Sequence, residues 1–330
     1  IFYYPLDFAW IVRRYLRVLQ PRILILMESE LWPRMIFEAD RANIPIVVVN
    51  ARISDRSLPR YRALHRLWQP FLRKLTRVLA QSEQDAERFR DIGVPPERVG
   101  VAGNLKYDVR TGGESKIAGE LRAHLSDDAK VIVAGSTLEG EERYLLEAFR
   151  EMLPQYPGLV LILAPRHPER FRDVEQVIQE MGVPSIRRST WPQEPIVRGS
   201  VILLDSIGEL ASVYSLATLA FVGGSLIPAG GHNPLEPAQF SVPIIMGPYA
   251  ENFRGMVAVL LNNEAIRVTP PERLASVFSE LLASPDSAGM GARARHVFEE
   301  HAGASEVCFA AIAKILEKNS ATSFPARGLR

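Results

Sequence analysis

Short apolar runs alternate with amphipathic stretches along almost the whole chain, which is typical of βαβ units built around a parallel sheet. Before a polar interruption from Asn104 to Asp128, this pattern predicts strands over 23–27, 46–49, 77–80 and 99–101 and helices over 7–19, 32–42, 56–75 and 82–93. After the interruption it predicts strands over 130–134, 159–164, 184–187, 201–204, 219–222 and 243–246, and helices over 140–153, 168–181, 271–283, 287–300 and 303–317.

The polar interruption divides the chain into two tandem α/β lobes. We expect a Rossmann-like lobe over 1–110, a linker over 111–128, a second Rossmann-like lobe over 129–318 and a flexible tail over 319–330. Such lobes bind ligands where their parallel strands end. The first lobe shows only about four strands, fewer than a doubly wound half usually has, so we expect it to be incomplete.

Composition and charge narrow the function classes. Lys plus Arg number 39 and Asp plus Glu 38, which gives a net charge of +1 and argues against a general nucleic-acid binder. The single cysteine, Cys308, excludes an intrachain disulfide framework and a cysteine-cluster metal site. The chain contains no run of about 18 uncharged apolar residues, and its start shows no signal-peptide pattern.

A glycine-rich segment from Gly223 to Pro237 follows one predicted strand and precedes a helix that begins near Pro234. Glycines let backbone N–H groups approach an anion, and a helix N-terminus adds positive potential. Asn233 and Glu236 are three residues apart and therefore face one ligand, for which the carboxylate suits ribose hydroxyls. Alternatively, Asn233 caps the helix, Pro234 is its first residue and Glu236 completes a capping box. The length and mixture of the segment favour ligand binding, and both interpretations can hold together.

Three further loops follow predicted strands of the second lobe. Ser136 lies in a turn whose N–H groups suit a carboxylate or phosphate, or which merely caps a helix. Arg166 lies between two prolines at a strand end, where its guanidinium can fork onto a phosphate. The loop over 205–210 contains Glu209, which either contacts a ligand or is simply solvated in the first turn of a helix.

The first lobe offers acids and bases at its own strand ends. Glu28 and Glu30 share a face if the strand continues, and one of them is then a candidate general base or a binder of sugar hydroxyls. Alternatively, Glu30 only stabilises the start of the next helix. Arg52 follows the second strand and Lys106 lies where the lobes join; both are candidates to bind anionic substrate groups.

The stretch from Arg52 to Arg77 carries eight basic residues against the single acid Asp55. Leu67 and Trp68 are interleaved with these charges. A basic helix with such neighbours fits an anionic membrane surface or a phosphorylated amphiphile. The alternative is a solvated helix face whose apolar stripe lies in the core.

Taken together, seven segments resemble the 3-deoxy-D-manno-oct-2-ulosonic acid (Kdo) transferases of lipopolysaccharide synthesis. They are MESELWP at 27–33, NARISDRS at 50–57, GNLKYD at 103–108, AGST at 134–137, APRHPERF at 164–171, DSIGEL at 205–210 and FVGGSLIPAGGHNPLEP at 221–237. The resemblance covers nearly the whole chain. It implies a GT-B fold, in which two Rossmann-like lobes face a central cleft, and a reaction that uses neither a metal ion nor a cofactor.

The resemblance also implies a reaction: Kdo passes from CMP-Kdo to a lipid A precursor (lipid IVA), with inversion, at the cytoplasmic face of the inner membrane. The first lobe would bind the acceptor lipid and the second the nucleotide. The nucleotide contacts implied are Pro165, Arg166, Ile207, Gly208, Glu209, Asn233, Pro234, Leu235 and Glu236.

The family's catalytic base is expected upstream of Ile1, which leaves Glu28 and Glu30 as candidates within this sequence. The remaining candidate contacts to substrate are Arg52, Lys106, Ser136 and His232. Two other functions stay open, a nucleotide-sugar 2-epimerase on the same fold and a non-catalytic nucleotide-binding fragment.

Overall fold

A computed structural model describes residues 4–108 and 116–321 of the chain. The chain forms two compact units, which are treated separately below. The first unit comprises Ile1–Asp108 together with His301–Arg330, and the second comprises Val109–Glu300.

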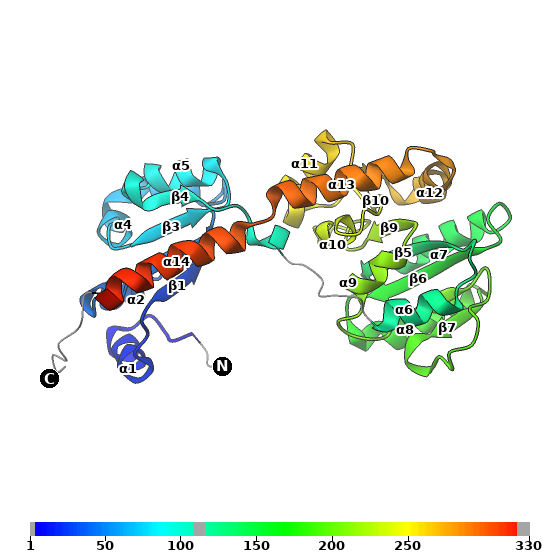
Figure 1. The fold of residues 1–330 in the computed structure, drawn as a ribbon, viewed down its shortest axis with the longest axis horizontal. Coiled ribbons are helices and arrows are strands. Elements are labelled where there is room, and N and C mark those ends of the chain that lie inside the picture. Colours follow the sequence, from blue (N-terminus) through cyan, green and yellow to red (C-terminus); the bar gives the residue numbers. More distant parts are fainter. Residues whose placement is uncertain (1–3, 109–115, 322–330) are drawn as a thin grey trace. The chain divides into compact units, whose positions relative to one another are not determined.

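The first unit contains a sheet of four parallel strands in the order β1-β2-β3-β4 (Figure 1). The strands are β1 (Leu24–Met27), β2 (Ile46–Ala51), β3 (Arg77–Ala80) and β4 (Val99–Val101). The helices are α1 (Ala9–Leu19), α2 (Pro33–Arg41), α3 (Leu58–Ala63), α4 (His65–Leu72), α5 (Glu83–Asp91) and α14 (Ala304–Ala321), with short 3-10 turns η1 (Pro96–Arg98) and η2 (Leu105–Asp108).

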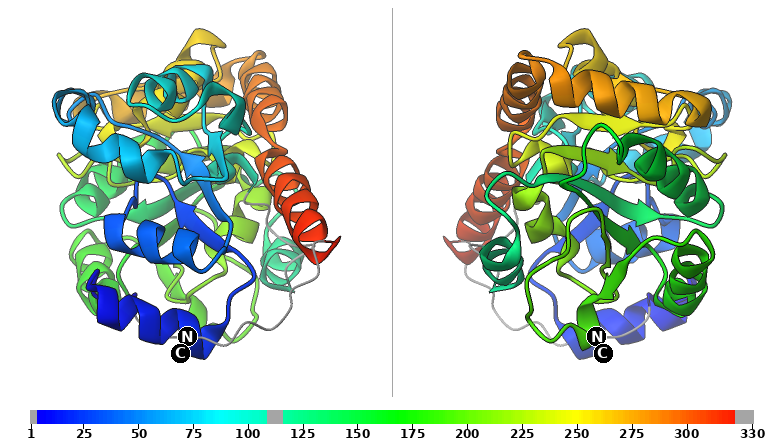
Figure 2. Two further views of the ribbon diagram at one scale, coloured as in Figure 1. Left: turned by 90° about the vertical axis from the view of Figure 1, so that its left-hand side faces the viewer. Right: turned by 90° about the vertical axis from the view of Figure 1, so that its right-hand side faces the viewer.

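Strand β2 is buried on both faces, as its unbroken apolar run predicts. Ile46 and Val48 pack into a core that also holds residues of α2 and α5. Val47 and Val49 face the opposite way and pack against Cys308 of α14. The helix therefore covers one face of this sheet, as Figure 2 shows for the helix drawn in red.

The position of α14 differs from the expected boundary, since the sequence pattern assigned all residues to 318 to the second lobe. The apolar residues Cys308, Ala311, Ile312 and Ile315 recur at helical spacing and bury against the first sheet. Asp108 accepts hydrogen bonds from the backbone N–H groups of two residues near the start of α14. Of the expected tail, residues 319–321 belong to α14 and 322–330 lie outside the described residues.

The second unit contains a sheet of seven parallel strands in the order β11-β10-β9-β5-β6-β8-β7. They are β5 (Lys130–Thr137), β6 (Leu159–Pro165), β7 (Ser185–Arg187), β8 (Val201–Leu203), β9 (Leu219–Val222), β10 (Ile244–Met246) and β11 (Ile266–Val268). Its longer helices are α6 (Lys116–His124), α7 (Glu141–Met152), α8 (Phe171–Glu180), α11 (Arg254–Asn262), α12 (Leu274–Ala283) and α13 (Ser287–His301).

Shorter helical segments connect these elements: η3 (Pro168–Arg170), η4 (Arg188–Thr190), α9 (Leu210–Val213), η5 (Tyr214–Leu216), α10 (Leu235–Ala238), η6 (Glu251–Phe253) and η7 (Pro271–Arg273). The strand order reverses between β5 and β9. From β5 the chain continues to β6 on one side of the sheet, and from β9 it continues to β10 on the other side. In doubly wound sheets, ligands bind at the carboxyl ends of the strands beside this reversal.

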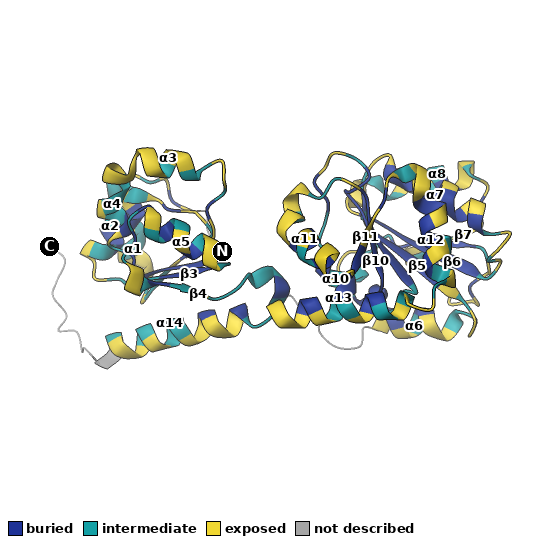
Figure 3. Cartoon of the chain, turned by 90° about the horizontal axis from the view of Figure 1, so that it is seen from above, coloured by how far each residue is buried: buried dark blue, intermediate teal, exposed yellow. Residues whose placement is uncertain are grey.

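The second sheet lies between two layers of helices. Ile132 and Ala134 of β5 face a core completed by α7, α8 and α12, whereas Val131 and Val133 face one completed by α6 and Tyr214. Figure 3 shows the strands in the dark blue of buried residues, while the outward faces of the helices are yellow. This sandwich confirms the predicted α/β fold class.

Several local predictions differ from the structure. Helix α6 lies within the expected linker over 111–128 and belongs to the second unit, because Ile117 and Leu121 are buried in its core. Residues 111–115 of the expected linker lie outside the described residues. The single helix predicted over 56–75 is broken at Leu64 into α3 and α4. The pattern also missed α11 and β11. None of the helices that the structure describes combines the length and apolar character needed to cross a bilayer.

Candidate functional site

The carboxyl ends of β5, β6 and β9 lie side by side in the second sheet. Gly135 of β5 pairs with Ala164 of β6 on one side and with Val222 of β9 on the other. Ser136, Arg166 and Gly223 therefore start from the same sheet edge, at the point where the strand order reverses. Ser136 is part of β5 rather than of a turn, and its left-handed backbone (φ 57°) marks a local irregularity.

The glycines after β9 are required by close packing. A Cβ atom on Gly223 would lie 2.5 Å from the carbonyl oxygen of Ser136, and one on Gly224 would lie 2.9 Å from Nε2 of His232. The N–H groups of Gly231 and His232 donate to the carbonyl oxygens of Gly224 and Gly223, respectively. The glycine-rich loop thus folds back on the end of β9 and holds the imidazole ring of His232 against it.

The backbone N–H groups of this loop bind a carboxylate of the protein itself. Glu141, the first residue of α7, has no exposed surface, and its oxygens accept hydrogen bonds from the N–H groups of Gly224 (2.6 Å), Ser225 (2.9 Å), Leu226 (2.8 Å) and Leu138 (2.9 Å). Burial raises the pKa of Glu141, while these four bonds act in the opposite direction. The expectation that the first N–H groups of the loop cradle an external anion is therefore wrong.

The expected contribution from a helix dipole is also small. Helix α10 is only four residues long, and the macrodipole effect depends on aligned peptide units over a longer segment. The N–H groups of Gly224, Ser225 and Leu226 and the dipole of α10 therefore contribute little to binding an anion at this sheet edge.

Glu142, next to Glu141, holds the neighbouring loop. Its side chain is buried, accepts a hydrogen bond from the hydroxyl of Thr137 (3.0 Å) and forms a two-pronged ion pair with Arg170 (2.7 and 3.2 Å). The N–H group of Arg166 donates to the carbonyl oxygen of Thr137 (2.9 Å). The first two residues of α7 thus tie down the loops after β9 and β6, a role that the sequence pattern did not reveal.

The side chains of Arg166, His232 and Glu236 share one electrostatic environment. Burial raises the pKa of Glu236, and the charge of Arg166 partly offsets this effect. Burial, together with the charges of Arg166 and His167, lowers the pKa of His232 and so favours its neutral form. Nε2 of His232 is buried and makes no hydrogen bond within the described part of the chain. A guanidinium, a neutral imidazole and a carboxyl group are suited to bind a phosphate together with hydroxyl groups.

The other candidates of the glycine-rich segment have structural roles. Oδ1 of Asn233 accepts a hydrogen bond from the N–H group of Leu235 (3.1 Å), in line with the capping alternative. Leu235 is almost completely buried, so its side chain belongs to the core. Pro234 is buried and immediately precedes α10 instead of being its first residue.

The loop after β8 is exposed at Ile207 and is held by contacts of Glu209. Ile207 is 81% exposed, and Gly208 has a left-handed backbone (φ 86°). Glu209 accepts a hydrogen bond from the hydroxyl of Ser206 and lies 3.5 Å from a guanidinium nitrogen of Arg188, so it is not simply solvated. Pro165, the last residue of β6, is buried.

In the first unit, the two acids after β1 do not continue a strand. Glu28 has a left-handed backbone (φ 53°) and β1 ends at Met27, so the expectation that Glu28 and Glu30 share a strand face is wrong. Glu30 is exposed and accepts a hydrogen bond from the indole of Trp32 (3.0 Å). The start of α2 is capped by Asp7, which accepts bonds from two of its N–H groups (2.9 and 2.7 Å), and not by Glu30.

The basic candidates of the first unit lie on different segments. Arg52 follows β2 and is exposed, whereas Lys106 lies half-buried in η2. Oδ1 of Asn50 accepts a hydrogen bond from the N–H group of Leu105 (3.0 Å), which joins the end of β2 to η2. Among the described residues, no group of three His, Cys, Asp or Glu side chains is arranged to hold a metal ion.

The basic stretch from Arg52 to Arg77 has two interpretations, a surface that binds an anionic membrane or a phosphorylated amphiphile, and a solvated helix face with its apolar stripe in the core. The structure fits each of them in part. Leu72 is fully buried, as the core alternative predicts, but Leu67 is 65% exposed. Arg62 pairs with Asp91 (2.7 Å), so part of the positive charge is balanced.

Comparisons with known proteins show which family the chain belongs to. A family model described as 3-deoxy-D-manno-octulosonic-acid transferase (kdotransferase) matches residues 1–109. The chain is 36% identical over 322 residues to the 3-deoxy-D-manno-octulosonic acid transferase of Haemophilus influenzae, covering 96% of this chain and 75% of that protein. It is 33% identical over 306 residues to the enzyme of the same name from Bordetella pertussis, covering 91% and 71%, respectively.

Two solved structures show which fold the chain shares. The C-terminal CMP-Kdo binding domain of WaaA from Acinetobacter baumannii is 35% identical and matches with a TM-score of 0.52, covering 55% of this chain and 96% of that domain. The UDP-GlcNAc 2-epimerase from Neisseria meningitidis is only 15% identical but matches with a TM-score of 0.59 over 94% of this chain and 80% of that one, which shows a common fold alone. The chain therefore belongs to the Kdo transferases, which are glycosyltransferases, and has a GT-B-like fold of two Rossmann-like lobes.

Proposed function

We propose that this protein transfers Kdo from CMP-Kdo to a hydroxyl group of a lipid A precursor, with inversion at the anomeric carbon and without a cofactor. The observation that carries the proposal is that Arg166 and the glycine-rich loop from Gly223 start from the same sheet edge, beside the reversal of strand order in the second unit. The charge of Arg166 acts on both His232 and Glu236 of this segment. The likeness of this unit to a solved CMP-Kdo binding domain supports the choice of donor.

The side chains suggest how the donor is bound. The guanidinium of Arg166 binds the phosphate of CMP and stabilises the negative charge that develops on it as the bond to Kdo breaks. The carboxylate of Glu236 accepts hydrogen bonds from the ribose hydroxyls. The exposed loop at Ile207 and Gly208 contacts the nucleotide beyond the ribose.

The transfer is a single displacement. The acceptor oxygen attacks the anomeric carbon of Kdo, the bond from that carbon to the phosphate oxygen of CMP breaks, and a base takes the proton of the acceptor hydroxyl. Glu28 and Glu30, after β1, are the candidate bases. Arg52 and Lys106 are candidates to pair with the carboxylate of Kdo.

We assign acceptor binding to the first unit. Leu67 and Arg66 lie on α4, and Leu64 immediately precedes this helix. Leu64 and Leu67 are exposed, so apolar and positive side chains occur together on the surface. Such a surface suits a phosphorylated lipid in an anionic membrane. We therefore place the enzyme at the cytoplasmic face of the inner membrane.

The test combines binding and turnover. Calorimetry should detect CMP binding to the full chain, and Arg166→Lys should weaken it, because lysine keeps the charge but loses the two-pronged geometry. Glu147→Gln, an exposed change on α7, is the matched control. The full chain is then incubated with CMP-Kdo and a lipid A precursor, and separately with UDP-N-acetylglucosamine alone, and the products are detected by mass spectrometry. Epimerisation of the UDP-sugar, or CMP binding that is insensitive to Arg166→Lys, would contradict the proposal.

A further inference from the structure

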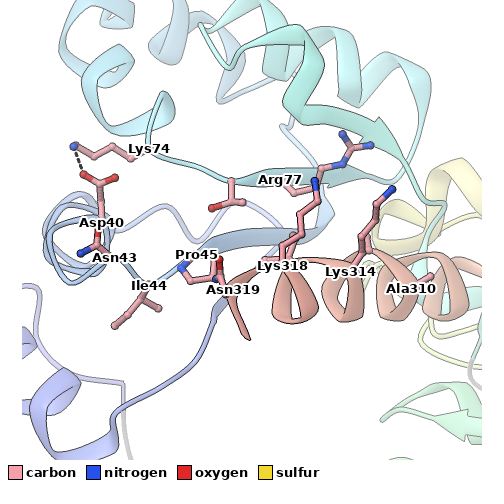
Figure 4. A pocket seen from close by; sticks show the side chains of 13 residues that line it. Asp40, Asn43, Ile44, Pro45, Lys74, Arg77, Ala310, Lys314, Lys318 and Asn319 are labelled. Carbon is pink, nitrogen blue, oxygen red and sulfur yellow. Dashed lines mark hydrogen bonds and ion pairs between the residues drawn. The ribbon is translucent and has the colours of Figure 1, made fainter. Parts of the chain in front are cut away.

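A cavity lies wholly within the first unit, at the amino ends of β2 and β3 (Figure 4). Its volume is about 870 Å³, within the range of about 300–1,000 Å³ that is usual for small-molecule sites. One wall is α14, and the others come from the end of α2 and the segments that precede the two strands. It is lined by Asp40, Asn43, Ile44, Pro45, Lys74, Thr76, Arg77, Ala310, Ala311, Lys314, Ile315, Lys318 and Asn319.

Positive charge dominates this cavity. Lys74, Arg77, Lys314 and Lys318 contribute four cationic groups, whereas Asp40 is the single acidic residue of the lining. Asp40 forms an ion pair with Lys74. The lining therefore carries more cationic than anionic groups.

Two of these cationic residues lie on the same side of α14. Lys314 and Lys318 are four residues apart, and like charges at this spacing destabilise a helix. Figure 4 shows both side chains extending from α14 toward the side where Arg77 lies. Arg77 donates one hydrogen bond to the carbonyl oxygen of Glu97 (2.9 Å), which uses one of its five N–H donors. An anion between these cations would relieve their repulsion.

Within the first unit, the cavity lies away from the candidate substrate residues Glu28 and Arg52. Pro45 and Thr76 lie immediately before β2 and β3, at the amino edge of the first sheet. Glu28 and Arg52 follow β1 and β2, at the opposite edge. The six residues of β2 place these edges about 20 Å apart.

We propose that this cavity is a binding site for a phosphate ester. Arg77 and Lys314 hold the phosphate, because a guanidinium fork and an ammonium group are the usual partners of phosphate oxygens. A phosphate monoester also carries a charge closer to that of the cluster than a single carboxylate does. The apolar wall of Ile44, Pro45 and Ile315 receives the carbon skeleton of the ester.

The experiment measures binding of two sources of this group to the full chain. Glycerol 1-phosphate, followed by calorimetry, represents a soluble monoester, and vesicles of phosphatidic acid, compared with phosphatidylcholine in a flotation assay, represent a lipid headgroup that carries the same group. We expect at least one of them to bind, and its affinity to fall by about tenfold or more in the double variant Arg77→Gln/Lys314→Gln, since each lost bond joins two charged groups. The control is Lys116→Gln, which removes an exposed lysine in the second unit.

A gain-of-binding variant covers the case in which the double variant does not fold. Asp40→Asn removes the carboxylate that pairs with Lys74, so it should strengthen binding of the same ligand. Glu236→Gln should leave this binding unchanged, which separates the cavity from the proposed CMP site. The proposal fails if neither source binds the wild-type chain, or if the double variant and Asp40→Asn bind it no differently from Lys116→Gln.

Discussion

Replacing Glu141 tests whether one buried carboxylate holds the glycine-rich loop. Each of its oxygens accepts two N–H groups, Oε1 those of Ser225 and Leu226 and Oε2 those of Gly224 and Leu138. Glu141→Gln keeps the shape but replaces one oxygen by an NH₂ group, so two buried donors face another donor. At about 1–3 kcal/mol for each unsatisfied group, the variant should lose about 2–6 kcal/mol of stability.

The loss of stability in Glu141→Gln is measurable by calorimetry. For a unit of this size, each kcal/mol lowers Tm by about 2–4 °C, so Glu141→Gln should melt about 4–24 °C below the wild type. CMP affinity should fall with it, because the loop that carries His232 loses its anchor. Glu147→Gln, exposed on the same helix, should stay within about 0.5 kcal/mol of the wild type. Equal melting temperatures for the two variants would refute the reasoning.

Four further predictions concern single residues. Glu236→Ala should weaken CMP binding by about 1–3 kcal/mol, measured by calorimetry, through lost hydrogen bonds to a charged group; unchanged affinity in a folded variant would remove Glu236 from the site. NMR titration should give His232 a pKa below its ordinary value, because of burial and the charges of Arg166 and His167, and bound CMP should raise this pKa by adding negative charge nearby; a pKa that does not respond to CMP would separate His232 from the nucleotide. Gly135→Ala should destabilise the second unit strongly in a denaturant titration, since its Cβ would lie 2.0 Å from the hydroxyl oxygen of Tyr214, and wild-type stability would contradict that packing. Asp108→Asn should lower the stability of the first unit at neutral pH and make it less sensitive to acid. Burial favours protonation of Asp108, but hydrogen bonds from the start of α14 outweigh it and lower its pKa, so its stabilising contribution is complete above the ordinary pKa of aspartate and is lost as pH falls through the lowered value; an identical acid-unfolding midpoint in the variant would argue against this role.

Most strands were predictable because a parallel strand buried on both faces needs an unbroken apolar run. The runs at 46–49 and 159–164 correspond to β2 and β6 within two residues. The elements that the pattern missed have weaker signals. Helix α6 buries only Ile117, Ala118 and Leu121 and is polar elsewhere, and β11 is three residues long with one buried side chain.

The candidate donor residues were predictable for a related reason. Arg166 and the loop from Gly223 onward directly follow apolar strands, so their place at the carboxyl edge follows from chain order. Chain order does not reveal what else approaches that edge. Glu141 and Glu142 resemble ordinary acids of a first helical turn, and only their burial against two loops distinguishes them.

The amino-acid sequence by itself determined the α/β class, the positions of most strands and the residues that end them, because burial of alternating elements leaves a local periodic signal. Tertiary structure alone decided that α14 packs on the first sheet, that β1 ends before Glu28, and that a carboxylate of the protein occupies the N–H groups of the glycine-rich loop. Each of these depends on contacts between residues far apart in the chain, such as Glu141 with Gly224 and Cys308 with Val47. A local pattern encodes which face of an element is apolar, whereas the partner of that face is set by packing.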